Sequence, residues 1–254
     1  MKNLENELQE LTKEWIESKC WKNEKFIFEN DKKETIGNVF VEDGVVDYTE
    51  YDKQKLKILF ILKEAHTSSE EKKKEKSSLI VDIKNGVVRN FWNRLAEWSV
   101  GLLNQDESKI INFDLITQEQ KNMEIRKTAI INLKKSDGDT KTDMERYVEY
   151  FYTQDNLVNE EYVYYLMKQI ELINPDVIIC GGTFNIFNKL FKERIEKIKD
   201  VRRGYYFWKR LNDKKAIVID YYHPSWQNSA DLLYYGLCST YQQILKNKED
   251  DIIG

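Results

Sequence analysis

The 254-residue sequence contains only 2 prolines and 10 glycines, and they do not gather into a stretch that would serve as a flexible linker. We therefore expect one domain over residues 1–254, with residues 1–50 as an N-terminal helix and lead-in and residues 51–245 as the core. The 3 cysteines, Cys20, Cys180 and Cys238, stand far apart. Their spacing fits neither a disulfide framework nor a zinc or iron–sulfur site, so we expect buried, reduced thiols. In the main interpretation developed below, the protein uses no metal and no cofactor.

Long hydrophobic runs and a strong charge of one sign are also missing. Uncharged apolar runs such as 177–180 are too short to span a bilayer, and residues 1–10 are too charged for a signal peptide. We therefore expect a cytoplasmic protein with no membrane partner. The net charge is −4, from 40 Lys and Arg against 44 Asp and Glu. This balance excludes a basic field over the whole surface, so any contact with nucleic acid must come from a local patch.

Aromatic residues are plentiful: the 6 Trp, 15 Tyr and 11 Phe supply enough apolar surface for a folded core. Apolar runs of strand length alternate with stretches of helical periodicity. This alternation predicts a three-layer α/β/α sandwich around a central, mainly parallel four-stranded sheet. The charged segment 68–78 (SSEEKKKEKSS) is more typical of a solvated loop than of a DNA clamp, and residues 26–46 suggest short strands or an irregular lead-in. The expected main strands are 56–62, 128–133, 176–180, 205–209 and 216–222, and the expected helices are 3–19, 89–103, 157–173, 183–191 and 232–245.

Polar residues follow the expected parallel strands directly. Ligands of open parallel sheets bind beyond the carboxyl ends of the strands, so these residues are the first candidates for a site. They include a carboxylate (Glu64), a carboxamide (Asn132) and an imidazole (His223), a set that suits binding of a polar planar ligand and movement of a proton. A lone His is more often a structural residue, and a Glu at a strand end is often simply exposed to solvent, so it is their convergence that favours a site. The polar segments are 63–67, 132–135, 181–182 and 223–225.

Four segments in this order resemble the motifs of the uracil-DNA glycosylase superfamily. ILFILKEAHT resembles its first strand and water-activating loop, and AIINLKK is similar to its strand that ends in a base-reading Asn. PDVIICGGTFNIF resembles its third strand and turn, and DYYHPSWQ is similar to its final His-Pro-Ser motif. Together the segments cover roughly residues 56–245. Members that carry an iron–sulfur cluster have four cysteines, so the resemblance is to a member without one.

The resemblance implies a monofunctional DNA glycosylase that hydrolyses the N-glycosidic bond of a flipped-out nucleotide and leaves an abasic site. By similarity Glu64 orients or activates the water, His223 donates to a carbonyl oxygen of the leaving base, and Asn132 reads the Watson–Crick edge. We expect a monomer that binds DNA. The further base contacts implied are Ala65, His66, Thr67, and Phe91 or Trp92, although aromatic residues at helical spacing are more often core residues. The implied backbone contacts are Lys63, Lys134, Lys135, Gly182, Ser225 and Trp226, and the basic pairs 134–135, 202–203 and 209–210 would suit phosphates.

Departures from the superfamily pattern bear on the substrate. Lys63 and His66 stand where the first motif usually has Gly and Pro, which leaves the path of the water loop open. Lys63 beside Glu64 is interpreted as an ion pair; the alternative is an amine that attacks the sugar, which would give lyase chemistry. The last position of this motif is bulky in uracil-specific members but is Thr67 here. This smaller residue favours a modified or damaged pyrimidine, such as hydroxymethylated or glucosylated cytosine of phage DNA, in either repair or phage defence.

Two other classes remain open from the sequence. One is a metal-dependent hydrolase, whose ligands would be Glu64, His66, His223 and Asp137 or Asp139, although no clustered metal motif is present. The other is a nucleic-acid-binding or base-binding module that has lost catalysis, which the altered first motif favours. Sensitivity to chelators separates the first from a glycosylase, and binding without turnover identifies the second.

Overall fold

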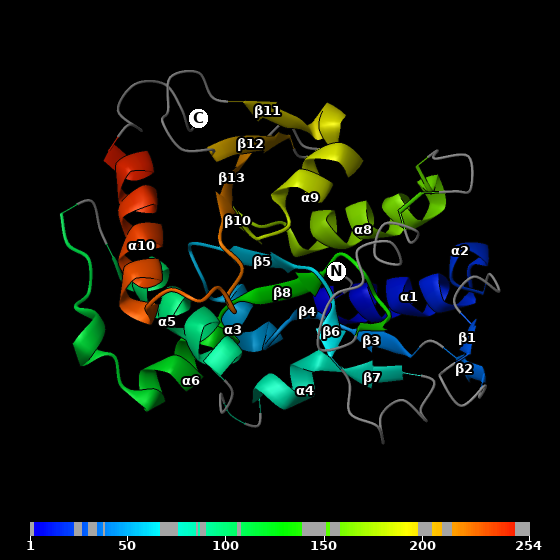
Figure 1. Ribbon diagram of the computed structural model, residues 1–254, viewed down its shortest axis with the longest axis horizontal. Coiled ribbons are helices and arrows are strands. Elements are labelled where there is room, and N and C mark those ends of the chain that lie inside the picture. The colour runs from blue at the N-terminus through cyan, green and yellow to red at the C-terminus, as the bar shows by residue number, and fades with distance from the viewer. Residues whose placement is uncertain are drawn as a thin grey trace.

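The computed structural model describes residues 3–22, 27–29, 35–37, 39–66, 76–84, 86, 90–105, 108–138, 151–152, 158–197, 205–209 and 215–246. Its centre is a mixed seven-stranded sheet with the strand order β11-β12-β13-β10-β5-β8-β4 (Figure 1). The expected α/β class is confirmed, but the expectation of four strands is wrong in number. Four adjacent strands pair in parallel, and β4, β11 and β12 extend them by antiparallel pairing.

The four parallel strands are β5 (Ile58–Leu62), β8 (Ala129–Asn132), β10 (Val177–Gly181) and β13 (Lys215–Tyr221). The antiparallel strands are β4 (Gly44–Val45), β11 (Ile195–Lys197) and β12 (Tyr205–Lys209). Three small sheets accompany them: β1 (Ile27–Glu29) with β2 (Thr35–Gly37), β3 (Phe40–Glu42) with β7 (Lys76–Ser78), and β6 (Ala65–His66) with β9 (Asp137–Gly138).

The helices of the described residues lie on both faces of the sheet. They are α1 (Leu4–Glu17), α2 (Lys19–Lys22), α3 (Tyr48–Asp52), α4 (Leu79–Lys84), α5 (Asn90–Asn104), α6 (Gln118–Arg126), α8 (Glu160–Ile173), α9 (Phe184–Leu190) and α10 (Ala230–Lys246), with 3₁₀ turns η3 (Phe113–Leu115) and η4 (Lys192–Arg194). Figure 1 shows α5 and α10 on one side of the central strands and α1, α8 and α9 on the other. Within the described residues, no helix has both the length and the apolarity that a membrane crossing requires.

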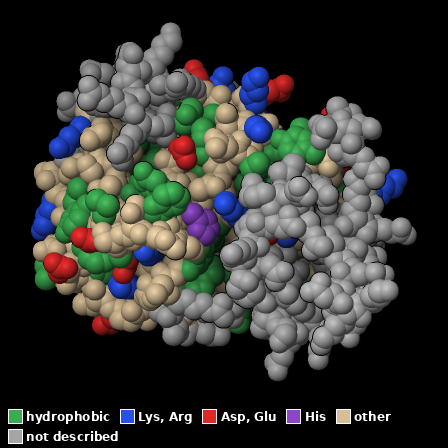
Figure 2. All heavy atoms as spheres, in the orientation of Figure 1, with side chains coloured by type: hydrophobic (Ala, Val, Ile, Leu, Met, Phe, Trp, Pro, Cys, Tyr) green, Lys and Arg blue, Asp and Glu red, His purple; other side chains and the backbone are tan. Residues whose placement is uncertain are grey.

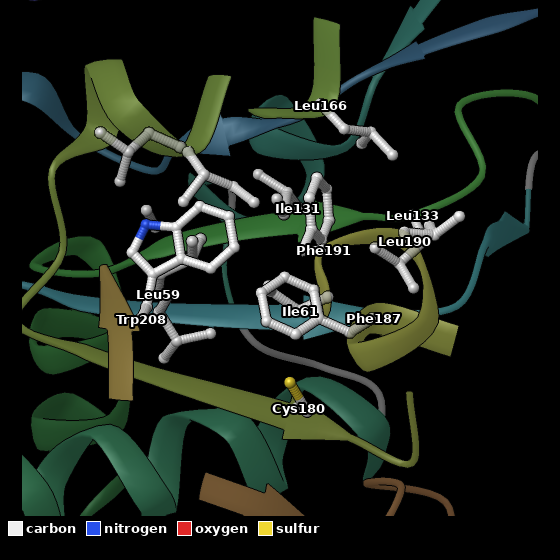
Figure 3. Packing of buried hydrophobic residues seen from close by; sticks show 14 of the residues in the cluster. Leu59, Ile61, Ile131, Leu133, Leu166, Cys180, Phe187, Leu190, Phe191 and Trp208 are labelled. Atoms are coloured by element: carbon white, nitrogen blue, oxygen red, sulfur yellow. The ribbon is translucent and has the colours of Figure 1, made fainter. Parts of the chain in front are cut away.

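The strand β5 is buried on both faces of the sheet, and its successive side chains contribute to two different cores. All five of its residues are buried, and successive side chains point to opposite faces of a sheet. Leu59 and Ile61 belong to the core under α1, α8 and α9, whereas Phe60 belongs to the core under α5 and α10. Figure 3 shows Leu59 and Ile61 packed with Leu166, Phe187 and other side chains of the first core. This double coverage is typical of a parallel sheet between two helical layers.

Most of the expected local features lie where the sequence placed them, with two exceptions. The N-terminal amphipathic helix is confirmed as α1, and the long helix before Pro175 ends as expected at Asn174, in the left-handed conformation with φ of 49°. All three cysteines are buried and free, as predicted. The loop expected over 68–78 is wrong at its end, where β7 and then α4 form. Thr183 precedes α9 as expected, but its hydroxyl donates to the Ile61 carbonyl at 2.9 Å instead of capping the helix.

Candidate functional site

The carboxyl ends of β13, β10, β5 and β8 lie side by side along one edge of the sheet. Adjacent strands are about 4.8 Å apart, so the residues that follow these four strands fall within about 15 Å of one another. The alignment continues past the strands, because Leu133 N–H donates to the Leu62 carbonyl at 2.9 Å and Lys134 N–H to the Lys63 carbonyl at 3.0 Å. The segments that follow β5 and β8 therefore remain neighbours beyond the sheet.

A glycine turn brings the end of β10 against the end of β13. Gly182 has a φ of +68°, and its N–H donates to the Tyr221 carbonyl at 2.8 Å. A Cβ at this position would lie 3.0 Å from the Cβ of His223, tighter than ordinary contacts. Glycine is therefore required here both for the backbone conformation and for the close approach to His223. Gly182 is exposed, and its structural role is to let the turn support the histidine segment.

His223 is held as a neutral imidazole with a defined proton. Its Nδ1 accepts a hydrogen bond from the Ser225 backbone N–H at 3.2 Å, so the neutral ring carries its proton on Nε2. Burial, and next the nearby Lys63 ammonium, lower the pKa of His223 to about 4. At neutral pH the ring is therefore a hydrogen-bond donor through Nε2 and carries no charge. The ring of Phe91, from the first turn of α5, lies 5.7 Å away between centroids.

An arginine that the sequence analysis did not single out fixes the segment around His223. Arg94 of α5 donates through Nη1 to the carbonyls of Pro224, at 2.7 Å, and Trp226, and through Nη2 to that of Asn228, at 2.8 Å. Its place three residues after Phe91 puts both on one face of the helix, and this spacing is the signal that would have suggested it. Arg94 thus ties the loop after β13 to the helix that carries Phe91.

We expect Arg94→Met to loosen the 223–228 segment and to lower the free energy of unfolding by about 1–3 kcal/mol, because charge-assisted hydrogen bonds to three carbonyls are lost. Arg94→Lys should be less stable than the wild type as well, since an ammonium cannot reproduce the planar arrangement of the guanidinium donors. Urea unfolding together with amide hydrogen exchange over 223–229 measures both effects. The control is Arg126→Met, which removes a half-exposed ion pair with Asp47. Equal exchange rates in Arg94→Met and the wild type would contradict the role of Arg94 in holding the 223–228 segment.

Glu64 and Lys134 form a buried ion pair across the ends of β5 and β8. Lys134 Nζ lies 2.8 Å from Glu64 Oε2, with side-chain exposures of 9% and 7%. The expected pair between Lys63 and Glu64 is therefore wrong: the partner of Glu64 is Lys134, and Lys63 lies near His223 instead. The second carboxylate oxygen of Glu64, Oε1, is buried and has no hydrogen-bond partner. The burial of Lys134 also removes the surface position that a phosphate contact would need.

Asn132 belongs to a buried polar cluster centred on Asp43, a residue that the sequence analysis missed. Asp43 Oδ2 accepts two hydrogen bonds from Asn132, one from its backbone N–H at 2.7 Å and one from its side-chain Nδ2 at 3.3 Å. The other oxygen, Oδ1, accepts from Lys135 Nζ at 2.5 Å and from Gln169 Nε2 at 3.1 Å. Burial lowers the pKa of Lys135, and the Asp43 carboxylate opposes this effect. Lys135 is only 1% exposed, so the expected contact with a DNA backbone is wrong for it.

The remaining candidates fall into three groups. Ala65 is buried, and Phe91 and Trp92 are partly buried against the core, with their rings 4.6 Å apart. Ser225 and Trp226 are exposed, and the ring of Trp226 lies 5.5 Å from that of exposed Tyr222. Figure 2 shows a histidine at the surface with a cationic side chain beside it and hydrophobic side chains around it. Thr67 and the side chain of His66 lie outside the described residues.

Two further features bear on alternative sites. Among the described residues, no three His, Cys, Asp or Glu side chains are grouped so that they could hold a metal ion. The alternative ligand set proposed from the sequence includes Asp139 and the side chains of His66 and Asp137, which the structure does not describe. A cavity of about 820 Å³ lies between α1 and the β3–β4 and α4 region, and its lining mixes acidic, basic and apolar side chains. Asp43 belongs to both this lining and the cluster around Asn132.

Comparison with known proteins finds no family model that matches the sequence and no curated protein that matches it. The functional argument therefore depends on the geometry of the strand-end edge.

Proposed function

We propose that the protein is a DNA glycosylase that hydrolyses the N-glycosidic bond of a flipped-out modified or damaged pyrimidine and leaves an abasic site. The observation that carries this proposal is the state of His223: a neutral imidazole whose Nδ1 is occupied by the Ser225 N–H and whose Nε2–H points away from that bond. Such a ring donates a hydrogen bond without having to give up its proton. The resemblance of the four strand-end motifs to the uracil-DNA glycosylase superfamily supports the same activity.

The chemistry of base release explains why a neutral donor is useful. When the bond between the base and C1′ breaks, its electron pair leaves with the base, and negative charge develops on a carbonyl oxygen of the pyrimidine. A fixed donor placed at that oxygen stabilises the charge more in the transition state than in the ground state. Donors of this kind contribute about 10²–10³ in rate. His223, with a pKa of about 4, remains in this donor form throughout the physiological pH range.

Glu64 supports the other half of the reaction. Positive charge develops on the deoxyribose as the base leaves, and a water must add to C1′; a carboxylate near the sugar favours both events. β5 and β13 are separated by β10, so the residues after them lie two strand spacings, about 10 Å, apart. This span would accept a nucleoside with its sugar towards Glu64 and its base towards His223. Exposed Trp226 and Tyr222 offer rings for neighbouring bases, and Lys63 offers a cation near the base.

Finer parts of the proposal depend on the same site. A role on hypermodified cytosine in phage DNA follows from the small residue at position 67, and repair of damaged pyrimidines uses the same chemistry. We further propose that the protein acts as a cytoplasmic monomer without a cofactor. Of the backbone contacts implied by the resemblance, Ser225, Trp226 and Lys63 keep positions that suit DNA, whereas Lys134 and Lys135 do not.

Base release tests the proposal directly. The protein is incubated in EDTA with oligonucleotides that carry uracil, 5-hydroxymethyluracil, hydroxymethylcytosine or glucosylated cytosine, and abasic sites are then cleaved with alkali. We expect strand breaks at one or more of these bases, and at least a 10²-fold lower rate for Glu64→Gln. The matched control is Glu97→Gln. Glu97 is also buried, also pairs with a lysine (Lys121) and also has one carboxylate oxygen without a hydrogen-bond partner, but it lies within α5 and not at a strand end. DNA binding without release from any substrate would replace the enzyme with a binding module.

A further inference from the structure

The ion pair between Glu64 and Lys134 leaves the carboxylate in one defined orientation. Lys134 is anchored by its own backbone N–H, which donates to the Lys63 carbonyl at 3.0 Å and thereby places the lysine opposite Glu64 on the neighbouring segment. Its ammonium holds Oε2 at 2.8 Å. Both side chains are more than nine-tenths buried, so neither is free to change partner by swinging into solvent. The direction of the second oxygen, Oε1, is thereby fixed as well.

The bare oxygen is the feature that points to a ligand. An ionised carboxylate accepts several hydrogen bonds, and a buried acceptor without a donor is costly. Oε1 is such an acceptor, and it lies at the mouth of β5, on the edge where the four parallel strands end. A hydrogen-bond donor that is present in the complex with substrate, and is not a protein group, would satisfy this oxygen. A water molecule that is about to attack the sugar is a donor of this kind.

We propose that Lys134 is a positioning residue: it holds Glu64 by Oε2 so that Oε1 receives the attacking water. The inference rests on the proposed glycosylase function. In this step the bond between C1′ and the base nitrogen breaks and its electron pair leaves with the base. The bond between C1′ and the water oxygen forms, and the proton that the water loses passes to Oε1. Lys134 acts through Glu64 and does not touch the substrate, which differs from the phosphate contact expected from the sequence.

Single-turnover and steady-state base release by five variants test this role. Lys134→Met should lower kcat about 10²-fold and change KM less than 3-fold, because a misplaced carboxylate affects the chemical step and not DNA binding. Lys134→Arg, which keeps the charge, should recover at least 10-fold of this loss. Lys134→Met combined with Glu64→Gln should be no slower than Glu64→Gln alone. Lys121→Met is the matched control, since it removes an ammonium from another buried carboxylate, and its kcat should equal that of the wild type.

The outcomes separate the two proposals. Release by the wild type that Lys134→Met leaves unchanged would overturn the inference alone. A raised KM with a weaker salt dependence of binding, or additive losses in the double variant, would assign Lys134 to phosphate contact and would also overturn it. Lys134→Met could fold poorly because it leaves the Glu64 carboxylate buried without its partner. The double variant has no such buried charge, so it still tests the inference if the single variant does not fold. No release by the wild type from any of the oligonucleotides would overturn the proposed function, and the inference with it.

Discussion

His223→Ala is expected to slow base release by about 10²–10³-fold at pH 7, while the wild-type contribution of this residue stays level from pH 8 to pH 5. Under the proposed mechanism, the variant removes the Nε2–H donor that meets the leaving base. The level profile follows from the pKa of about 4, since the ring stays neutral throughout this range and becomes an imidazolium only near pH 4. Rates measured on one modified oligonucleotide between pH 4 and pH 8 provide the test.

The same pKa predicts how stability depends on pH. The folded value of about 4 is lower than the ordinary value of 6.5, so folding favours the neutral ring. This contribution is fully present above pH 6.5 and is lost as the pH falls towards 4, because the unfolded chain then binds a proton that the folded protein does not. Discounted for partial exposure, it amounts to about 2–3 kcal/mol. Urea unfolding at pH 7 and pH 5 should therefore show a smaller pH dependence in His223→Gln than in the wild type.

Other results would change the interpretation of the site. A His223→Ala variant that releases base at the wild-type rate would remove this residue from catalysis. A wild-type rate that falls steeply between pH 7 and pH 6 would mean that the ring titrates near its ordinary pKa, and the neutral-donor mechanism would then fail. A control for global damage is the unfolding midpoint of His223→Ala, which should remain high enough for the variant to be folded at the assay temperature.

The sequence was informative where a local pattern determines the structure. The run ILFIL predicts a strand covered on both faces because alternate residues of any strand face opposite sides, and β5 is such a strand. The glycine pair at the end of β10 predicts a tight turn, and the positive φ of Gly182 shows why glycine is needed there. His223 and Glu64 are candidates from the sequence because they stand within two residues of the end of an apolar run. Strand ends are a property of the local sequence, so their place on one edge could be predicted.

Side-chain partners could not be predicted in this way. Lys134 and Glu64 are 70 residues apart, Lys135 and Asp43 are 92 apart, and Arg94 and Pro224 are 130 apart. The local sequence pattern does not indicate which of two adjacent lysines is buried or with which carboxylate it pairs. The usual expectation for a lysine is an exposed side chain. Lys134 and Lys135 depart from it because the chain brings one carboxylate to each, and this depends on how the strand ends are packed.

Lys135→Met is expected to lower the free energy of unfolding by about 3–5 kcal/mol, a large part of the total for a single domain. Lys135 is 1% exposed and Asp43 is fully buried, so the variant leaves a buried carboxylate that has lost its charged partner. Asn132 and Gln169 still donate to Asp43, but neutral donors do not replace an ammonium at 2.5 Å. Methionine matches the length of the lysine and can keep the packing near Trp15. Urea unfolding at pH 7 measures the loss.

Asp43→Asn should cost less than Lys135→Met, because burial already lowers the pKa of Lys135 and a lysine without its partner can lose its proton. The stability of Asp43→Asn should then rise with pH, since the unfolded chain binds more protons at this lysine than the folded protein does. The double variant Lys135→Met with Asp43→Asn should recover part of the loss, and the coupling between the two sites should exceed about 1 kcal/mol. Strictly additive losses would show that the two side chains stabilise the fold independently.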